Sequence, residues 1–407
     1  MKILHTADWH IGKKLHKHDL APDFELFISW LCETIIKQKI ELLLVSGDVF
    51  DLANPSSEAR RQYYRALLQL KKLDCRLILT GGNHDSPAML DAPGDILREM
   101  DVHVIGGLPQ DINDVIIPVK GKTGNIEIVI AALPFLRDAD LRTAGEGNTY
   151  EDRLEATRKG IQNTFLNAAE ICREKFPNVP VIAMGHLFAA GAETSESERD
   201  IQIGNQAAFN ALQFGEYFKY IALGHIHKPQ RINGAVPTYY SGSPIPLSFS
   251  ERSDEKRVLL IDTEAGFIPE SIPVPSFRKL LKITGTLEDI RLKLHGLEGN
   301  HQLDSLIEVV LTEDQYNAEL IFRFDELVTN FDKPGFEIVK HRTSFTHQQR
   351  GASEIYKNST QLEDLSPREV FLELINKHQY DEETQQELIS AFVELLEEVQ
   401  QDYEESI

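Results

Sequence analysis

The sequence predicts an α/β fold in which most strands are buried on both faces. Short runs rich in Ile, Leu and Val recur through the first two-thirds of the chain, and segments with apolar residues at helical spacing lie between them. Continuous apolar strands of this kind are typical of layered α/β proteins, because each face of the sheet is covered. The runs are KILHT, ELLLVSG, CRLILTGG, IVIAALP, PVIAMGH and YIALGH.

The helical spacing predicts helices over about residues 22–38 and 55–73, and Pro55 is a plausible start for the second. The later runs TYYSGSP and RVLLIDT have no helix between them. We therefore expect either a mixed sheet or two stacked sheets.

The chain has 407 residues, more than one hydrophobic core usually supports, so we expect several domains. Pro273 and Pro275 interrupt the pattern and indicate a boundary. The next segment reads strand, helix, strand, helix, strand, which is typical of a small α+β domain. A polar, weakly patterned linker follows, and then a helical tail. The expected divisions are 1–275, 276–345, 346–365 and 366–407.

The tail begins with Ser366 and Glu369 at capping-box spacing, and Pro367 stands at the first helical position. Each of the two predicted tail helices carries an apolar face. The helices either pack back on their own domain or form a docking surface for a partner protein. The apolar residues are Val370, Phe371, Leu374 and Ile375 in the first helix, and Leu388, Phe392, Leu395 and Val399 in the second.

The composition argues against several classes of protein. No segment approaches the roughly 18 uninterrupted apolar residues of a membrane-spanning helix, and the N-terminus lacks the features of a secretory signal. We therefore expect a cytoplasmic protein without a membrane partner. The three cysteines are far apart and never form a CxxC pair, which argues against a disulfide framework and a thiolate metal site. They are Cys32, Cys75 and Cys172.

The net charge of −22 would ordinarily argue against nucleic-acid binding, because affinity for phosphate backbones comes largely from Lys and Arg. The charge is unevenly distributed, however. Residues 352–407 contain fifteen Asp and Glu against three Lys and Arg, so the tail carries over half of the excess. The rest of the chain is much closer to neutral.

Five short polar motifs follow apolar strands directly. The carboxyl ends of neighbouring strands meet at one crevice in α/β sheets, so residues more than 200 positions apart can share a site. The glycines before the polar residues let the backbone turn sharply. The motifs are Asp8-Trp9-His10, Gly47-Asp48-Val49-Phe50-Asp51, Gly82-Asn83-His84-Asp85, Gly185-His186 and Gly224-His225-Ile226-His227.

These residue types predict two divalent metal ions. The first set of ligands is Asp8, His10 and His227, and the second is Asn83, His186 and His225. Asp48 would offer an oxygen to each ion, because two neighbouring cations repel and need a bridging carboxylate. Ligation by imidazole, carboxylate and amide groups suits Mn²⁺, Fe²⁺ or Zn²⁺, and Mn²⁺ is our first choice.

A pair of metal ions that activates a bridging water predicts phosphoester hydrolysis. His84 follows the ligand Asn83 and is the best candidate to donate a proton to the leaving oxygen, with Asp85 orienting it. His5 lies inside a predicted strand, where a role in the core or behind the ligands is expected. His16 and His18 are expected in a solvated loop.

The ordered set of motifs over roughly the first 230 residues resembles the calcineurin-like metallophosphoesterases. Two stretches outside the ligand set, AGAETSESERDIQIG at 190–204 and YSGSPIPLSFSE at 240–251, are similar to the SbcD family of nuclease subunits. The resemblance implies a four-layer β-sandwich flanked by helices, with a small α+β cap domain that faces DNA. It also implies a Mn²⁺-dependent, ATP-dependent 3′→5′ double-strand exonuclease and hairpin endonuclease that serves DNA repair, recombination and replication.

The resemblance further implies partners. The helical tail would bind the coiled coil of the ATPase SbcC, and the chain would form a homodimer within a heterotetramer with SbcC that acts on DNA ends and hairpins. One position departs from relatives in archaea and eukaryotes. Asp51 stands where those proteins often have a second active-site histidine, so the role of this position stays open.

Two rival functions share the fold. Another calcineurin-like phosphoesterase could act on nucleotides or small phosphodiesters, whereas a non-catalytic scaffold is expected to lack ligands that are all present here. A purple acid phosphatase is disfavoured, because Asp51 occupies the position of its metal-binding tyrosine.

Overall fold

The computed structural model describes residues 1–141, 150–195, 197–198, 201, 208–299, 301–314, 317–345, 371, 388 and 391–392. One compact unit comprises Met1–Thr312 and Asn317–Ser344, and a second comprises Glu313–Tyr316 and Phe345–Ile407. The predicted linker and nearly all of the predicted tail, including its capping box, lie outside the described residues. Within the second unit, the rings of Phe371 and Phe392 stack with centroids 3.8 Å apart.

The first sheet is mixed, with five strands that run in one direction and one that runs against them. Strands β1, β4, β5 and β6 run parallel, while β13 pairs antiparallel with β1 and β14 pairs antiparallel with β13. The strand order is β14 (Glu270–Pro273), β13 (Arg257–Asp262), β1 (Lys2–Thr6), β4 (Leu42–Ser46), β5 (Arg76–Thr80), β6 (Val102–Ile105). The chain therefore places its first strand at the centre of this sheet.

The second sheet is also mixed, but its antiparallel strands stand at both edges. Strands β12, β10, β9 and β8 run parallel, and the edge strands β11 and β7 are antiparallel to their neighbours. The strand order is β11 (Gln230–Ile232), β12 (Thr238–Tyr240), β10 (Tyr220–Gly224), β9 (Val181–His186), β8 (Ile126–Ala132), β7 (Ile116–Lys120). Both alternatives left open by the sequence thus occur together, as two mixed sheets.

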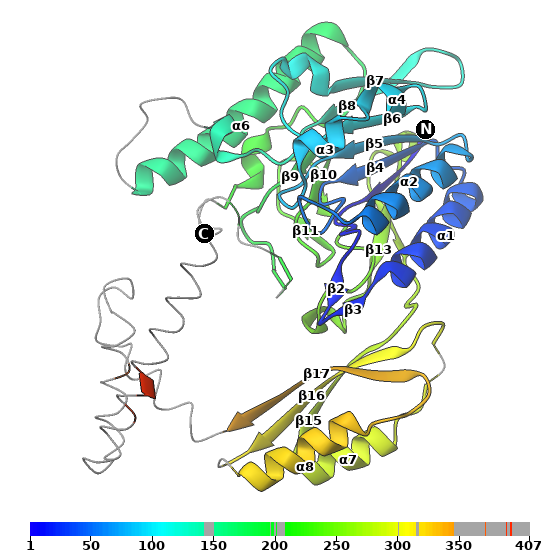
Figure 1. Cartoon of the computed structure of the whole chain (residues 1–407). Coiled ribbons are helices and arrows are strands. Elements are labelled where there is room, and N and C mark those ends of the chain that lie inside the picture. Colours follow the sequence, from blue (N-terminus) through cyan, green and yellow to red (C-terminus); the bar gives the residue numbers. More distant parts are fainter. Residues whose placement is uncertain are drawn as a thin grey trace. The chain divides into compact units, whose positions relative to one another are not determined.

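Alternate residues of the strands enter different apolar clusters. In β1, Ile3 belongs to a cluster that also contains Ile130 and Met184 of the second sheet, whereas Leu4 belongs to a cluster with residues of α1 and α2. Helix α6 packs similarly against the other face of the second sheet (Figure 1). The prediction of strands buried on both faces is confirmed. The helices are α1 (Ala21–Gln38), α2 (Ser57–Lys71) and α6 (Tyr150–Lys175).

The region after the two prolines forms a three-stranded sheet in the order β15, β16, β17, with its own apolar cluster that includes Phe324 of α8. Its elements alternate as the sequence predicts, and a capping box of Thr286 and Asp289 begins α7. They are β15 (Leu280–Gly285), α7 (Leu287–His295), β16 (Ser305–Glu313), α8 (Ala318–Thr329) and β17 (Phe336–Phe345).

Short elements complete the described chain. They are β2 (Lys14–Leu15), β3 (His18–Asp19), α3 (Pro87–Asp91), α4 (Gly94–Arg98), α5 (Asp138–Leu141), and the 3₁₀ turns η1 (Ile112–Val115), η2 (Ala211–Phe214), η3 (Phe249–Glu251) and η4 (Thr263–Ala265). None of the helices within the described ranges has the length and apolar character needed to cross a membrane.

Candidate metal centre

The seven predicted metal ligands come together at one edge of the two sheets. Parallel strands end at the same edge, so the polar residues that follow them meet there. The first sheet supplies Asp8 and His10 after β1, Asp48 after β4, and Asn83 after β5; the second supplies His186 at the end of β9, and His225 and His227 after β10. All are buried except Asn83, which is partly exposed.

Two glycines allow the sheets to approach closely at this edge. A Cβ atom on Gly47 would lie 2.1 Å from His186 Nδ1, and one on Gly224 would lie 1.7 Å from the carbonyl oxygen of Ser46. These distances leave no room for a side chain. Glycine is therefore required at both positions by the contact between β4 and the second sheet.

Four of the predicted ligands have a left-handed backbone. The φ angles are 53° at Asp8, 45° at His10, 48° at Asp48 and 101° at His225. Such conformations cost a residue with a Cβ roughly 1–2 kcal/mol. They persist where the surrounding structure enforces them, which is commonly at functional sites.

The first predicted ligand set is compact. Ligand atoms of Asp8, His10 and His227 all lie within 4.8 Å of one another, and the Nε2 atoms of the two imidazoles are 3.1 Å apart. The spacing lets one cation contact all three side chains. The structure therefore brings together the residues that the DxH and HxH motifs supply.

The second predicted set is equally compact. Ligand atoms of Asp48, His186 and His225 lie within 4.8 Å of one another. The Oδ1 atom of Asn83 lies 2.9 Å from His186 Nε2 and 3.1 Å from His225 Nδ1. Asp48 Oδ2 lies 3.3 Å from His186 Nε2 and 3.6 Å from His10 Nε2, so this oxygen stands between the two sets.

The donor atoms fit a pair of cations. Among the described residues, the buried atoms Asp8 Oδ2 and His225 Nε2 have no hydrogen-bond partner. Buried polar atoms are normally satisfied, and a metal ion held by the first ligand set would satisfy Asp8 Oδ2. Burial, with the charge of Asp48, raises the pKa of Asp8 to about 7. Burial lowers the pKa of His186, but the Asp48 and Asp8 carboxylates outweigh it and raise the pKa to about 9.

His84 lies against the first ligand set. Its ring stacks edge-on against His10 with centroids 4.7 Å apart, and its Nδ1 lies 2.7 Å from the carbonyl oxygen of Asp51. These two contacts hold the imidazole ring beside the first ligand set. The backbone N–H of His84 donates to Asp48 Oδ1 at 2.9 Å.

The Asp85 carboxylate accepts hydrogen bonds from backbone N–H groups of three residues at 2.8–3.0 Å. It thereby ties the loop after β4 to the loop after β5. The sequence suggested that Asp85 orients His84; the contact found at His84 Nδ1 is instead the carbonyl of Asp51. The three donors are Val49, Phe50 and Gly82.

Asp51 and Ser46 hold two of the imidazoles from behind. Asp51 Oδ1 lies 3.2 Å from His10 Nδ1 and accepts from Lys13 Nζ at 3.0 Å. The carbonyl oxygen of Ser46 lies 3.1 Å from His186 Nδ1. In both cases Nδ1 faces an acceptor and Nε2 faces the ligand cluster, which is the orientation that metal-binding histidines usually have.

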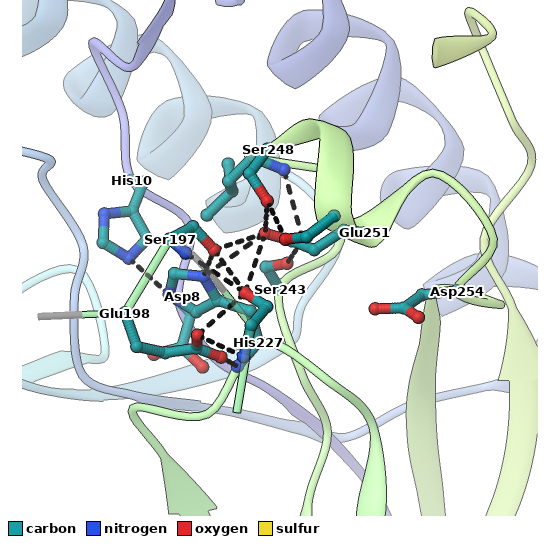
Figure 2. Close-up of polar contacts among 12 residues, drawn as sticks. Asp8, His10, Ser197, Glu198, His227, Ser243, Ser248, Glu251 and Asp254 are labelled. Atoms are coloured by element: carbon teal, nitrogen blue, oxygen red, sulfur yellow. Dashed lines mark hydrogen bonds and ion pairs between the residues drawn. The ribbon is translucent and has the colours of Figure 1, made fainter. Parts of the chain in front are cut away.

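A polar network around His227 was not predicted. Ser197, Glu198 and Glu251 surround the ring and backbone of this residue (Figure 2). Burial alone would raise the pKa of the Glu251 carboxyl, but Lys256 holds it well below its usual range. These residues come from the stretches 190–204 and 240–251, which the sequence marked by resemblance without indicating a role.

Other histidines and the cysteines lie outside the cluster. His5 is fully buried and its Nδ1 lies 3.0 Å from the hydroxyl of Tyr220. His18 was expected in a solvated loop, but it contacts Arg278 and Glu337. His16 is exposed and stacks on Phe249. The three cysteines are free thiols.

Comparison with known proteins identifies related chains. The profile of the calcineurin-like phosphoesterase family matches residues 1–229, and one described as the type 5 capsule protein repressor C-terminal domain matches residues 276–379. The chain is 40% identical over 349 residues to SbcD, the SbcCD nuclease subunit of Rhodobacter capsulatus, covering 83% of this chain and 82% of the relative.

Other SbcD proteins match almost the whole chain. The relative from Escherichia coli K12 is 32% identical over 404 residues, which are 97% of this chain and 98% of the relative. The relative from Bacillus subtilis is 28% identical over 403 residues, with 97% of each covered. The chain therefore belongs to the calcineurin-like phosphoesterases and, within them, to the SbcD family of SbcCD nuclease subunits.

Proposed function

We propose that this chain is a DNA nuclease that hydrolyses phosphodiester bonds with two divalent ions, Mn²⁺ in the first place, as the partner of an SbcC ATPase. The observation that carries the proposal is the convergence of seven buried or partly buried ligand side chains from both sheets. The relatives are named as nuclease subunits of SbcCD, which supports a nucleic-acid substrate and SbcC as the partner.

The residues would divide the work as follows. Asp8, His10 and His227 would hold one ion, and Asn83, His186 and His225 the other, with Asp48 shared. When bound, the ions would supply an activated water and neutralise charge on the phosphoryl oxygens. His84 would donate the proton that the leaving oxygen needs, while the Asp51 carbonyl holds its ring.

Asp85 would act by positioning. Its three backbone contacts hold the loops that carry Asp48 and Asn83 in register with each other. Asp51 would orient His10 through the contact at Nδ1, a role that differs from that of an additional proton donor. Asp51 and Asp85 would therefore set the geometry of the site and would not transfer protons in the reaction.

The finer architecture belongs to the same proposal. The apolar cluster shared by the two sheets, together with the helix-covered clusters on their other faces, supports a four-layer sandwich over residues 1–275. Residues 276–345 would form a cap that faces DNA, and 346–365 a linker. The tail, 366–407, would bind SbcC, and the match of a C-terminal family profile to residues 276–379 supports a dedicated role for this end.

The assembly would be cytoplasmic, with two copies of this chain in a heterotetramer with SbcC. The net charge of −22 then has a simple consequence. Because phosphate binding depends on Lys and Arg, the ATPase would supply much of the basic surface. The isolated chain is expected to bind DNA weakly and in a strongly salt-dependent manner. Tight binding at physiological salt without SbcC would contradict this division of labour.

The decisive assay uses a 3′-labelled hairpin duplex with Mn²⁺, with and without SbcC and ATP. Cleavage should require Mn²⁺ and should increase with both additions. The variant His84→Gln should lose about 10²–10⁴-fold in rate and keep its metal content. His103→Gln, which changes a histidine of β6 outside the cluster, serves as the control.

The same assay tests the rival substrate class. A phosphoesterase specific for nucleotides or small diesters would prefer a small chromogenic phosphodiester to duplex DNA by orders of magnitude. Such a preference in the complex with SbcC would refute the assignment of DNA as substrate. Loss of metal from His84→Gln would show that His84 is a ligand and not the proton donor.

A further inference from the structure

A buried ion pair lies behind the first ligand set. The Glu251 carboxylate is fully buried, and Lys256 Nζ, itself 5% exposed, donates to its Oε2 at 2.5 Å. A buried pair of this kind contributes little net stability, because desolvation offsets the attraction. Its contacts therefore point to a role other than stabilising the fold.

Ser197 connects this ion pair to His227. The Ser197 hydroxyl donates to Glu251 Oε1. The Oγ atom of Ser197 also lies 2.6 Å from His227 Nδ1 (Figure 2). A serine hydroxyl has a single hydrogen, and an ionised carboxylate can only accept. The hydrogen of Ser197 therefore lies toward Glu251, and the hydrogen between Ser197 and His227 must come from Nδ1.

This assignment determines the tautomer of His227. With the proton on Nδ1, the Nε2 atom carries a free lone pair. Nε2 is also the atom that lies 3.1 Å from His10 Nε2, inside the first ligand set. The chain of contacts from Glu251 through Ser197 thus presents the metal-binding nitrogen in the form that can coordinate a cation.

The backbone of His227 is held by the same network. Lys256 Nζ donates to its carbonyl oxygen at 3.0 Å, and its N–H donates to Glu198 Oε1 at 2.8 Å. The ring and the main chain are therefore fixed by one connected group. His10 differs, because its Nδ1 faces the Asp51 carboxylate directly.

We propose that Ser197 and Glu251 are positioning residues that set the tautomer and orientation of His227 for the ion held by Asp8, His10 and His227. The inference rests on the proposed function, since it requires that His227 bind a metal ion. It assigns a purpose to two stretches, around 197 and 251, that lie far from the ligand motifs in sequence.

The test measures Mn²⁺ binding to the full chain by titration calorimetry. Ser197→Ala removes the connecting hydroxyl and leaves Glu251 paired with Lys256. It should weaken one of the two Mn²⁺ sites by about 10–100-fold and leave the other unchanged. Ser197→Thr keeps a hydroxyl and should restore most of the affinity. Thermal unfolding in EDTA should be similar for wild type and Ser197→Ala.

Ser248→Ala is a matched control. Ser248 Oγ donates to Glu251 Oε1 at 3.2 Å, so this variant removes a contact to the same carboxylate while leaving Ser197 and His227 in place. It should bind Mn²⁺ as the wild type does. Wild-type affinity at both sites of Ser197→Ala, or an equal loss in Ser248→Ala, would overturn the inference.

The outcome also separates this inference from the function on which it rests. If the wild type binds two Mn²⁺ ions and His227→Ala abolishes one site, the metal assignment holds whatever Ser197→Ala does. If the wild type binds no Mn²⁺, or His227→Ala binds two ions normally, both the metal assignment and the positioning role are refuted. Imidazole ¹⁵N shifts of the metal-free chain provide a second readout, in which His227 should be protonated at Nδ1 in the wild type.

Discussion

Replacing Gly47 by alanine tests how tightly the two sheets must meet at the metal centre. Gly47 has φ +83°, and an added Cβ would lie 2.1 Å from His186 Nδ1 and 2.7 Å from His186 Cγ. The ring cannot move without cost, because its Nδ1 contacts the Ser46 carbonyl at 3.1 Å. Gly47→Ala should therefore displace a metal ligand.

The expected magnitude has two parts. A left-handed alanine costs roughly 1–2 kcal/mol, and overpacking a filled site costs about 1–3 kcal/mol. Relief of the clash requires His186 to move by about 1 Å, whereas a functional constellation tolerates about 0.5 Å. We therefore expect a loss of about 2–5 kcal/mol of stability and a loss of Mn²⁺ affinity at the site that contains His186.

Gly124→Ala provides a matched control. Gly124 has φ +84°, and no atom lies within 4 Å of its added Cβ. This variant carries the backbone cost alone, about 1–2 kcal/mol, and should bind Mn²⁺ normally. Urea unfolding in EDTA measures the stability of both variants, and titration calorimetry measures the affinity. Normal binding of two ions by Gly47→Ala would refute the argument from close contact.

Three further predictions concern pH and stability. Burial lowers the pKa of His5 to about 3. Below pH 6.5 the imidazole therefore binds a proton in the unfolded chain but not in the folded one, and the free energy of unfolding falls by up to about 1.4 kcal/mol for each unit by which the pH is lowered. Urea unfolding at several pH values should show a smaller decrease for His5→Gln than for the wild type. Mn²⁺ must displace protons from Asp8 and His186, so its affinity should fall as the pH drops from 9 to 6, with proton release visible in calorimetry across buffers. Asp23→Asn breaks the buried ion pair in which Arg278 Nε donates to Asp23 Oδ1 at 2.6 Å. The free energy of unfolding measured with urea should fall by about 3–5 kcal/mol, while the Mn²⁺ affinity stays unchanged. Unchanged stability together with a lower Mn²⁺ affinity would contradict this prediction.

The convergence of the proposed ligands could be predicted because each of them lies at the end of a strand or in the loop directly after it. A run such as YIALG predicts where a strand ends, and the motif after it then falls at the edge where parallel strands meet. The apolar runs likewise predicted eight of the twelve strands in the two sheets, whereas β6, β7, β11 and β14 were not predicted. Local order along the chain was sufficient for both.

The residues behind the ligands could not be predicted in this way. Ser197 and Glu251 are 54 positions apart, and no spacing rule relates either of them to His227. The contacts of Asp51 and Asp85 depend on how the loops after β4 and β5 turn, which tertiary packing decides. The left-handed backbone at Asp8 and Asp48 was equally hidden, because neither residue is a glycine.

The division of the ligands between the two sheets has a consequence for how the protein matures. The first sheet contributes Asp8, His10, Asp48 and Asn83, and the second contributes His186, His225 and His227, so each proposed ion needs both. A chain in which one sheet has formed and the other has not would have no complete cation pocket. Nuclease activity would therefore appear only after both sheets have folded, and partly folded chains would not cleave DNA.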